Sequence, residues 1–419
     1  FVPLVMLAAL AGQLALALLS PALGHPDEPV HLEAGGYYED HWTLPRADDP
    51  EIRGSYSAYG FSRLNMPEVG YFLAGKFSSA IEWFGIEERH LRLRLFNVLL
   101  FGLLTLAAFL RLRFRILLLP LLLTPQVWYI FSYFNSDAFA LAMCYPFFFA
   151  CVAEKGPVAR LLRGDWAGSP GRLVAAGALV ALPFGLLKMN FWFIGGFVVG
   201  YLVVNLFWTP AARRRAALVG LGIVLLTPVA ANLAWRFASD WTNDFRRTAA
   251  MEEMRDRTAE SIYHPDSPLD KTHYGLYLRD RGVKFHELFT RKRWHEITLG
   301  SSFGNYGWFG IRPSPLYYDR VAGIFALFLL LLLFPAVFRM NRREGLIVAG
   351  ALFSGCVMIL VSALHSWMND FQAQGRYLAP VLPLLGMALF EVRGKVSWPL
   401  LGIPVGALVL LSLYSFFFI

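Results

Sequence analysis

Long apolar stretches limit what this chain can fold into more than any other feature of its sequence. A helix needs about 20 apolar residues to cross the hydrocarbon core of a bilayer. Read at that length, the sequence predicts about eleven membrane spans, which lie near residues 1–22, 93–111, 115–131, 137–153, 172–187, 191–208, 215–236, 320–338, 345–364, 377–391 and 397–418. Only 16% of the residues are charged, whereas soluble domains carry about a quarter. We therefore expect an all-α polytopic membrane protein whose 419 residues form one transmembrane domain.

The first span could also be a signal peptide. It is longer than the apolar core of a signal peptide, it lacks a clear small-x-small cleavage site, and it runs directly into an acidic motif. We expect it to remain in the protein as a membrane anchor.

Basic residues cluster in alternate connections between the predicted spans. The clusters are Arg111, Arg113 and Arg115; Lys155, Arg160, Arg163 and Arg172; Arg213, Arg214 and Arg215; Arg339, Arg342 and Arg343; and Arg393 with Lys395. Cytoplasmic loops of membrane proteins carry an excess of Lys and Arg. These connections and the N-terminus are therefore predicted to be cytoplasmic, and they account for the net charge of +8 without a nucleic-acid partner.

Two large polar segments, residues 23–92 and 237–319, then fall outside the cytoplasm. Both are rich in Trp, Tyr and Phe and contain no low-complexity run, so we expect them to be folded and the second to pack on the membrane face. Residues 283–298 mix aromatic and basic side chains, which is typical of an amphipathic helix at a membrane surface. The outer segments are thus predicted to carry short amphipathic helices.

Unusual polar residues converge on the outer side, at about the same depth. They are Asp27, Glu28 and His31; Asn135 and Asp137; Lys188 and Asn190; Asn305 and Trp308 within residues 301–308; and Gln372, Gln374, Arg376 and Tyr377. Each group has a simpler interpretation by itself, because acids cap helices and long basic side chains anchor at the interface. Their coincidence on one face favours a functional site.

The chemistry of these residues suits glycosyl transfer from a phosphate leaving group. Carboxylates supply a general base, lysine and arginine bind phosphate, and amides and aromatic rings bind sugars. The sequence has no glycine-rich nucleotide loop, which favours a lipid-borne donor. His25, His31 and His41 could bind a metal with Asp27, but their spacing matches no strong ligand signature.

The run Asp27-Glu28-Pro29-Val30-His31 resembles the acidic first-loop motif of the GT-C superfamily of polyprenyl-phosphate-sugar glycosyltransferases. More narrowly, the chain resembles the DUF2142 family of bacterial membrane proteins. That resemblance covers residues 26–383 and is carried by Asp27-Glu28-x-x-His31, Asn135-Ser136-Asp137, the turn at Lys188, residues 302–308 and residues 374–380. It implies a GT-C-like fold in a bacterial inner membrane, with the site between the helices and the outer loops.

The resemblance also implies roles for individual residues and inversion at the anomeric carbon. Asp27 would take the proton of the acceptor hydroxyl, and Glu28 would orient the acceptor or share that role, so the identity of the base stays open. Lys188 and Arg376 would hold the donor phosphate. The sugar or acceptor pocket would be lined by His31, Asn135, Asp137, Asn305, Trp308, Gln374 and Tyr377. Some GT-C members use a divalent metal, but the first loop has no Asp-x-Asp, so no metal or other cofactor is predicted.

Two other functions use similar chemistry. An O-antigen polymerase or ligase type enzyme would take a lipid-diphosphate donor, but it does not account for the Asp27-Glu28 motif. A flippase or transporter of lipid-linked sugar would need polar residues along the middle of several spans, and these regions are nearly all apolar. The acceptor could be a glycan, a lipid-linked sugar or a protein, because composition does not distinguish them.

Overall fold

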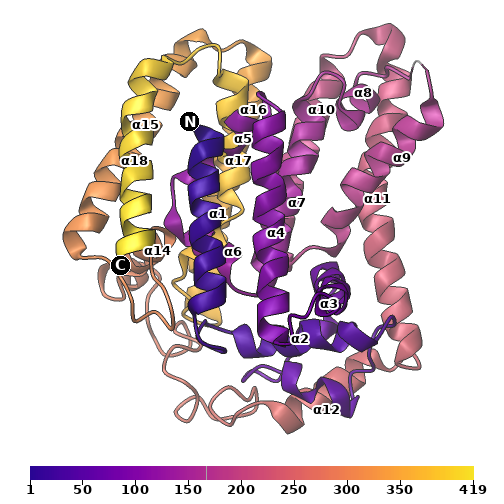
Figure 1. Cartoon of the computed structure of the whole chain (residues 1–419), viewed down its shortest axis with the longest axis vertical. Helices are drawn as coiled ribbons and strands as arrows, with labels where there is room; N and C mark the ends of the chain where they lie inside the picture. Colours follow the sequence, from indigo (N-terminus) through magenta and orange to yellow (C-terminus); the bar gives the residue numbers. More distant parts are fainter. Residues whose placement is uncertain (167) are drawn as a thin grey trace.

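The computed structural model describes residues 1–166 and 168–419, with the side chains of residues 335 and 336 excepted. Within this part of the chain 71% of the residues are helical and no β-strand forms. Most of the helices run between two ends of the molecule (Figure 1). The prediction of an all-α fold is confirmed.

Eight helices of the described residues are long and apolar enough to cross a membrane. They are α1 (Val2–Leu19), α4 (Arg89–Leu110), η5 with α10 (Met189–Phe207), α11 (Ala211–Thr242), α15 (Pro315–Arg339), α16 (Arg342–Met368), η6 with α17 (Gly375–Val392) and α18 (Trp398–Phe418). Such a set is compatible with a polytopic membrane protein.

The three remaining predicted spans are shorter or bent. The span predicted at 115–131 consists of α5 with η3 (Phe114–Leu122) and α6 (Pro125–Ser132), which meet at 93° and could form a ninth crossing. The bend has a local cause, because Thr124 caps α6 and Pro125 cannot continue the preceding helix. The other two are the shorter apolar helices α7 (Ser136–Val152) and α9 with η4 (Pro170–Leu186). Among the described residues, length and composition support eight crossings, or nine with the bent pair, and the predicted count of about eleven is not confirmed.

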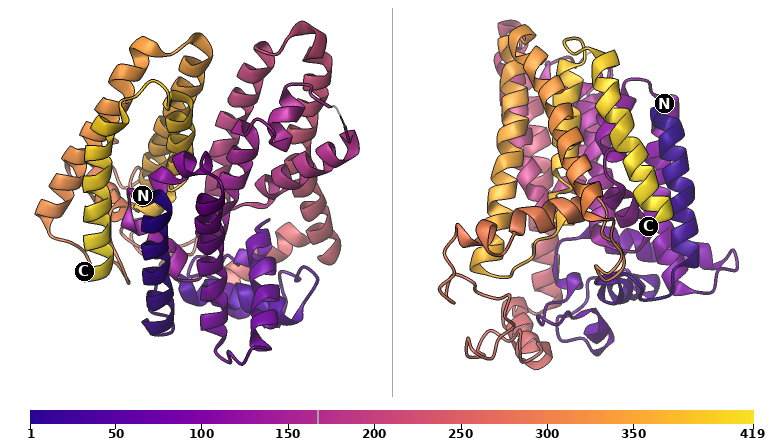
Figure 2. Two further views of the ribbon diagram at one scale, coloured as in Figure 1. Left: turned by 45° about the horizontal axis from the view of Figure 1, so that its top comes forward. Right: turned by 90° about the vertical axis from the view of Figure 1, so that its left-hand side faces the viewer.

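The two predicted sides of the protein lie at opposite ends of the helices. Figure 1 places α8 (Pro157–Leu162) and the connections with the basic clusters at its top, and α2 (Glu28–Asp40), α3 (Val69–Glu82) and α12 (Arg247–Thr258) at its bottom. The side view in Figure 2 shows the same separation. The segments that carry the candidate site therefore meet at the end opposite the basic connections.

The amphipathic helix predicted at 283–298 does not form as one element. The structure has α13 (Glu287–Thr290) and α14 (Trp294–Ser302), separated at Arg293, whose φ of 54° is left-handed and interrupts a right-handed helix. Trp294 is buried, and its indole N–H donates to Ser366 Oγ at 2.9 Å. The aromatic face of this segment therefore packs on the C-terminal end of α16, so the single-helix prediction is wrong.

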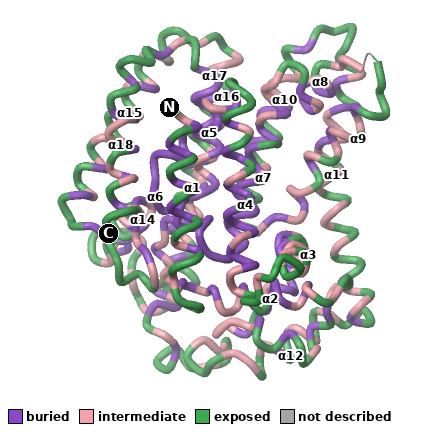
Figure 3. Tube along the Cα trace, in the orientation of Figure 1, coloured by how far each residue is buried: buried purple, intermediate pink, exposed green. Residues whose placement is uncertain are grey.

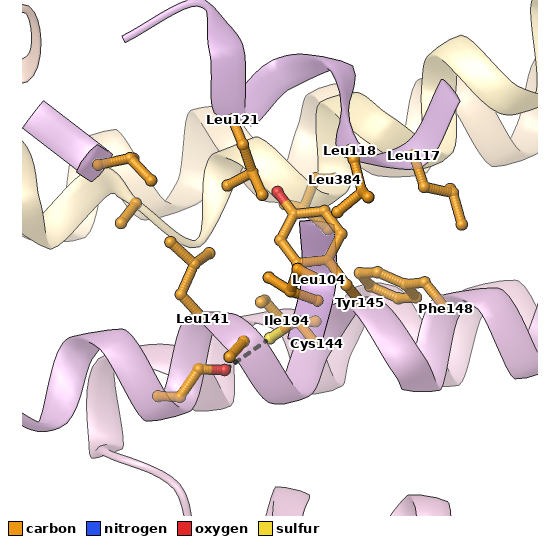
Figure 4. Packing of buried hydrophobic residues seen from close by; sticks show 14 of the residues in the cluster. Leu104, Leu117, Leu118, Leu121, Leu141, Cys144, Tyr145, Phe148, Ile194 and Leu384 are labelled. Atoms are coloured by element: carbon orange, nitrogen blue, oxygen red, sulfur yellow. Dashed lines mark hydrogen bonds between the residues drawn. The ribbon is translucent and has the colours of Figure 1, made fainter. Parts of the chain in front are cut away.

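The buried core surrounds α4 to α7 (Figure 3). Figure 4 shows Tyr145 and Phe148 of α7 packed among Leu104 of α4, Leu118 of α5 and Leu384 of α17. Within a bilayer, such packing stabilises helices through van der Waals contact more than through exclusion of water. It fixes the position of α7, whose first turn carries the predicted Asp137.

Candidate functional site

A buried arginine of α4 holds the connection between α1 and α2. Arg94 and Glu28 have no exposed side-chain area, and Nε and Nη2 of Arg94 donate to the two carboxylate oxygens of Glu28 at 2.7 and 2.8 Å. The same guanidinium donates to the carbonyls of Ala17, Ser20 and Pro21 at 3.1, 2.9 and 2.9 Å. The end of α1 and the start of α2 are therefore fixed to one side chain.

Asp27 lies directly before α2, where its φ of 61° is unusual for a residue other than glycine. Its carboxylate Oδ2 accepts a hydrogen bond from Nη2 of Arg376 in η6 (Gly375–Leu378) at 2.5 Å. The Arg376 side chain is 8% exposed and that of Asp27 is 43% exposed, so the carboxylate remains accessible from outside. The structure thus brings together the predicted base and one predicted phosphate ligand.

The second predicted cation is also paired with a carboxylate. Nζ of Lys188, between η4 and η5, lies 2.8 Å from Oδ2 of Asp137. Asn135 accepts a hydrogen bond from the backbone N–H of Ala138 at 3.0 Å and donates to the carbonyl of Ile130 at 2.6 Å. Asn135 therefore caps α7 and shapes the turn that presents Asp137, and both of its amide atoms are engaged in doing so.

His31 forms a buried contact with Tyr71 of α3, with 2.5 Å between Nδ1 and the hydroxyl oxygen. Burial, assisted by Arg63, Lys188 and Arg376, lowers the pKa of His31 well below its usual range. Burial also raises the pKa of Tyr71 well above its usual value. The histidine is therefore neutral at pH 7, and the protonated tyrosine donates to it.

Arg63 of η2 (Arg63–Asn65) is a third cation at this site, and sequence reasoning missed it. Burial by itself raises the pKa of Asp27, but Arg376, Arg63 and Lys188 outweigh burial and hold that pKa below its usual value. Arg63 lies in a long polar loop, where one arginine has no feature that separates it from a solvated surface charge. Only the packing of η2 against α2 reveals its position.

The remaining predicted residues divide into two groups. Gln374 and Tyr377 flank Arg376, and the Tyr377 hydroxyl lies 3.5 Å from Nη2 of Arg376. Asn305 instead bonds through its backbone N–H to Gln126, and the indole of Trp308 is 60% exposed and donates to the Leu23 carbonyl at 3.4 Å. Among the described residues, neither Asn305 nor Trp308 forms a hydrogen bond or ion pair with the charged pairs of the site.

Several buried polar atoms of the site have no hydrogen-bond partner among the described residues. They are Oδ1 of Asp137, Oγ of Ser136, both amide atoms of Asn190, Oε1 of Gln374 and Nε of Arg376. A buried polar group left in this way costs about 1–3 kcal/mol unless water or a ligand satisfies it. Their concentration beside the two ion pairs is the feature expected of a polar ligand site.

The histidines considered as metal ligands do not converge. Each hydrogen-bonds to a different tyrosine, His25 to Tyr129, His31 to Tyr71 and His41 to Tyr37. In the described part of the chain, the group of His and acidic residues close enough to hold a metal is instead Asp256, His264 and Asp266 of the second outer segment. Among the residues that the structure describes, no histidine cluster therefore forms around Asp27.

Comparison with known proteins gives no match. The comparisons with protein families, with curated proteins and with solved structures each found no match. The functional argument therefore rests on the geometry of the site.

Proposed function

We propose that this protein is a GT-C-type membrane glycosyltransferase that moves a sugar from a polyprenyl-phosphate donor to an acceptor hydroxyl outside the cytoplasm. The observation that carries the proposal is the pair of contacts Asp27–Arg376 and Lys188–Asp137, which bring acids and cations from four separate segments to one end of the helices. A base next to phosphate-binding cations is what such a transfer requires.

In the proposed reaction, the Asp27 carboxylate accepts the proton of the acceptor hydroxyl. The acceptor oxygen attacks the anomeric carbon of the donor sugar and forms the new glycosidic bond. The bond between that carbon and the phosphate oxygen breaks, and its electron pair leaves with the polyprenyl phosphate. Arg376 and Lys188 stabilise the negative charge of this leaving group, and attack from the opposite face inverts the anomeric configuration.

Asp27 is a better candidate for the base than Glu28. Both carboxylate oxygens of Glu28 are bound by Arg94 and fully buried, whereas Asp27 is partly exposed. Arg376 keeps Asp27 a weak base in the resting protein. A donor phosphate that binds Arg376 would weaken this ion pair, raise the pKa of Asp27 and make it a stronger base.

The balance of charges favours a monophosphate donor over the diphosphate of an O-antigen type enzyme. The site contains three cations and three nearby acids, namely Arg63, Lys188, Arg376, Asp27, Asp137 and Glu68. A sugar phosphodiester adds one negative charge to this balanced set, whereas a diphosphate adds more charge without a matching cation. The diphosphate is therefore the more costly of the two ligands to bind at a partly buried site.

An apolar groove provides space for the isoprenoid chain. A cavity of about 500 Å³ lies between α10 and α16 and is lined by residues that include Trp192, Phe197, Gly200 and Phe353. Trp192 follows Lys188 by one turn, and its indole N–H donates to the carbonyl of Leu187 at 3.2 Å. A lipid in this groove would have its phosphate end near Lys188.

The test is transfer of labelled sugar from a panel of polyprenyl-phosphate sugars by the protein in nanodiscs. We expect Asp27→Asn to lower the rate by about 10²–10⁴, because loss of a general base typically has an effect of this size. Asp40→Asn is the matched control, since Asp40 is an exposed acid at the far end of the same helix. A flippase would move the donor and form no new bond. Transfer by Asp27→Asn at the rate of the unmodified protein would contradict the assignment of the base.

A further inference from the structure

We propose that Arg63 is the residue that first binds the phosphate of the incoming lipid donor. This inference rests on the proposed function and adds a residue to its phosphate site. It also assigns an order, in which Arg63 holds the phosphate before the phosphate displaces Asp27 from Arg376 or Asp137 from Lys188.

The two cations predicted from the sequence are already engaged. Arg376 is bound to Asp27 at 2.5 Å, and Lys188 to Asp137 at 2.8 Å. By contrast, the Arg63 side chain has no hydrogen bond and no carboxylate within 4.0 Å among the residues that the structure describes. Asp27 and Glu68 act on it electrostatically without touching it. Arg63 is therefore the cation that can bind an anion without first breaking an ion pair.

The backbone that carries Arg63 is firmly held, although its guanidinium is not. Ser62 caps η2 by accepting the N–H of Leu64 at 3.1 Å, and its hydroxyl lies 2.6 Å from that of Ser55. Leu64 is buried, and the side chain of Asn65 donates to the Tyr56 hydroxyl at 3.3 Å. A fixed backbone keeps the guanidinium within one side-chain length of the site, so ligand binding orders the Arg63 side chain but not the loop that carries it.

The position of Arg63 suits contact with the same phosphate that Arg376 would bind. η2 packs on α2, the helix that begins next to Asp27 and carries His31. Arg63 is close enough to interact electrostatically with Asp27, His31 and Tyr377. A guanidinium binds phosphate through two parallel hydrogen bonds, which makes arginine well suited to a first contact.

The order of contacts has a kinetic consequence. Because Arg63 acts before the chemical step, its loss should weaken donor binding and raise KM more than it lowers kcat. Loss of Asp27 should do the reverse, because a general base acts in the transition state.

The experiment measures binding of undecaprenyl phosphate, without a sugar, to the purified full-length protein in detergent. We expect Arg63→Ala to weaken binding by about 10- to 100-fold, the range typical of a hydrogen bond to a charged group. Arg63→Lys should lose less, because it keeps the charge but not the two parallel hydrogen bonds. Arg53→Ala is the matched control, since Arg53 is an exposed arginine of the same outer segment.

Each outcome decides between the two proposals. If the unmodified protein does not bind undecaprenyl phosphate, the proposed function fails. If it binds and both Arg63 variants bind equally well, the role of Arg63 fails and the proposed function stands. Equal, Arg63-dependent binding of phosphatidic acid or inorganic phosphate would show a general phosphate site and overturn the assignment to an isoprenoid donor. Thermal unfolding of each variant shows whether it is folded. If Arg63→Ala does not fold, binding of undecaprenyl phosphate by Arg63→Lys decides whether Arg63 has the proposed role.

Discussion

At the scale of single residues, the two carboxylates of the acidic motif have separated into different environments. Glu28 faces inward and is bound on both oxygens by Arg94, while Asp27 faces Arg376 and remains partly exposed. The sequence predicts that this motif lies at the outer membrane border, but adjacent Asp and Glu look equivalent there. The left-handed backbone at Asp27 turns the two side chains apart, and no local sequence signal predicts that turn.

The ion pair at Asp27 predicts how activity depends on pH. Arg376, Arg63 and Lys188 hold the pKa of Asp27 below its usual value of 3.8, so the carboxylate stays ionised in mild acid. We expect Arg376→Gln to raise this pKa, because it removes a positive charge that lowers the pKa while burial continues to raise it. The acid limb of kcat/KM should therefore move to higher pH in profiles of this variant.

The same pair contributes to stability with a defined sign. Because the pKa of Asp27 is lower in the folded protein, the stabilisation is present above the usual pKa and is lost as pH falls through the lowered value.

The pH profile of Arg376→Gln also tests the role of Asp27. If the acid limb of its kcat/KM profile does not move, Asp27 is not the group that controls the rate.

At the scale of helices and loops, the length of the apolar stretches predicts most of the long helices. Sharp bends inside an apolar stretch are harder to predict. Residues 115–131 look like one span because they are apolar almost throughout, yet the chain turns by 93° between η3 and α6. Thr124-Pro125 was the available signal, since Thr is a good N-cap and Pro favours the first turn of a helix. Arg94 gave no such signal, because near the start of a predicted span it resembles an interfacial anchor.

The contact between α4 and the α1–α2 connection predicts a separation of stability from activity. Arg94→Met should destabilise the protein by about 3–5 kcal/mol, because Glu28 is left as an unpaired buried charge. Adding Glu28→Leu removes that charge and should restore most of the melting temperature. Transfer activity should stay low in the double variant, because the carbonyls that Arg94 binds no longer fix the Asp27 turn.

Measurement of thermal unfolding and sugar transfer on the same samples tests this separation. Arg89→Met is a suitable control, because Arg89 lies at the start of the same helix and its side chain is about half exposed. Normal sugar transfer by the double variant would mean that the contacts of Arg94 with the α1–α2 connection have no part in placing Asp27.

At the scale of the whole molecule, the structure separates the two sets of connections that the sequence assigns to opposite sides. The basic connections lie at one end and the long outer segments at the other (Figure 1). The sequence could predict this arrangement because alternating loops each carry their own charge signal. The sequence also predicts that the spans near 137–153 and 172–187 are among the shorter ones, and the structure has shorter apolar helices there, α7 and α9 with η4.

We propose that the end with α2 and α12 faces away from the cytoplasm, and this orientation gives a direct prediction. A membrane-impermeant thiol reagent added to intact spheroplasts should label a cysteine placed at Asp270, which is exposed in the second outer segment. It should not label a cysteine at Arg214, which is exposed in the first turn of α11, until the membrane is opened. Labelling in the opposite order would reverse the topology and place the site on the cytoplasmic side.

The hydrogen bond from Arg376 to Asp27 joins residues 349 positions apart. During synthesis, the chain therefore exposes its acidic turn long before the ribosome reaches the guanidinium that neutralises it. A copy of the chain that ends before η6 lacks the guanidinium that pairs with Asp27. Under the proposed function, such a copy is expected to be inactive in sugar transfer.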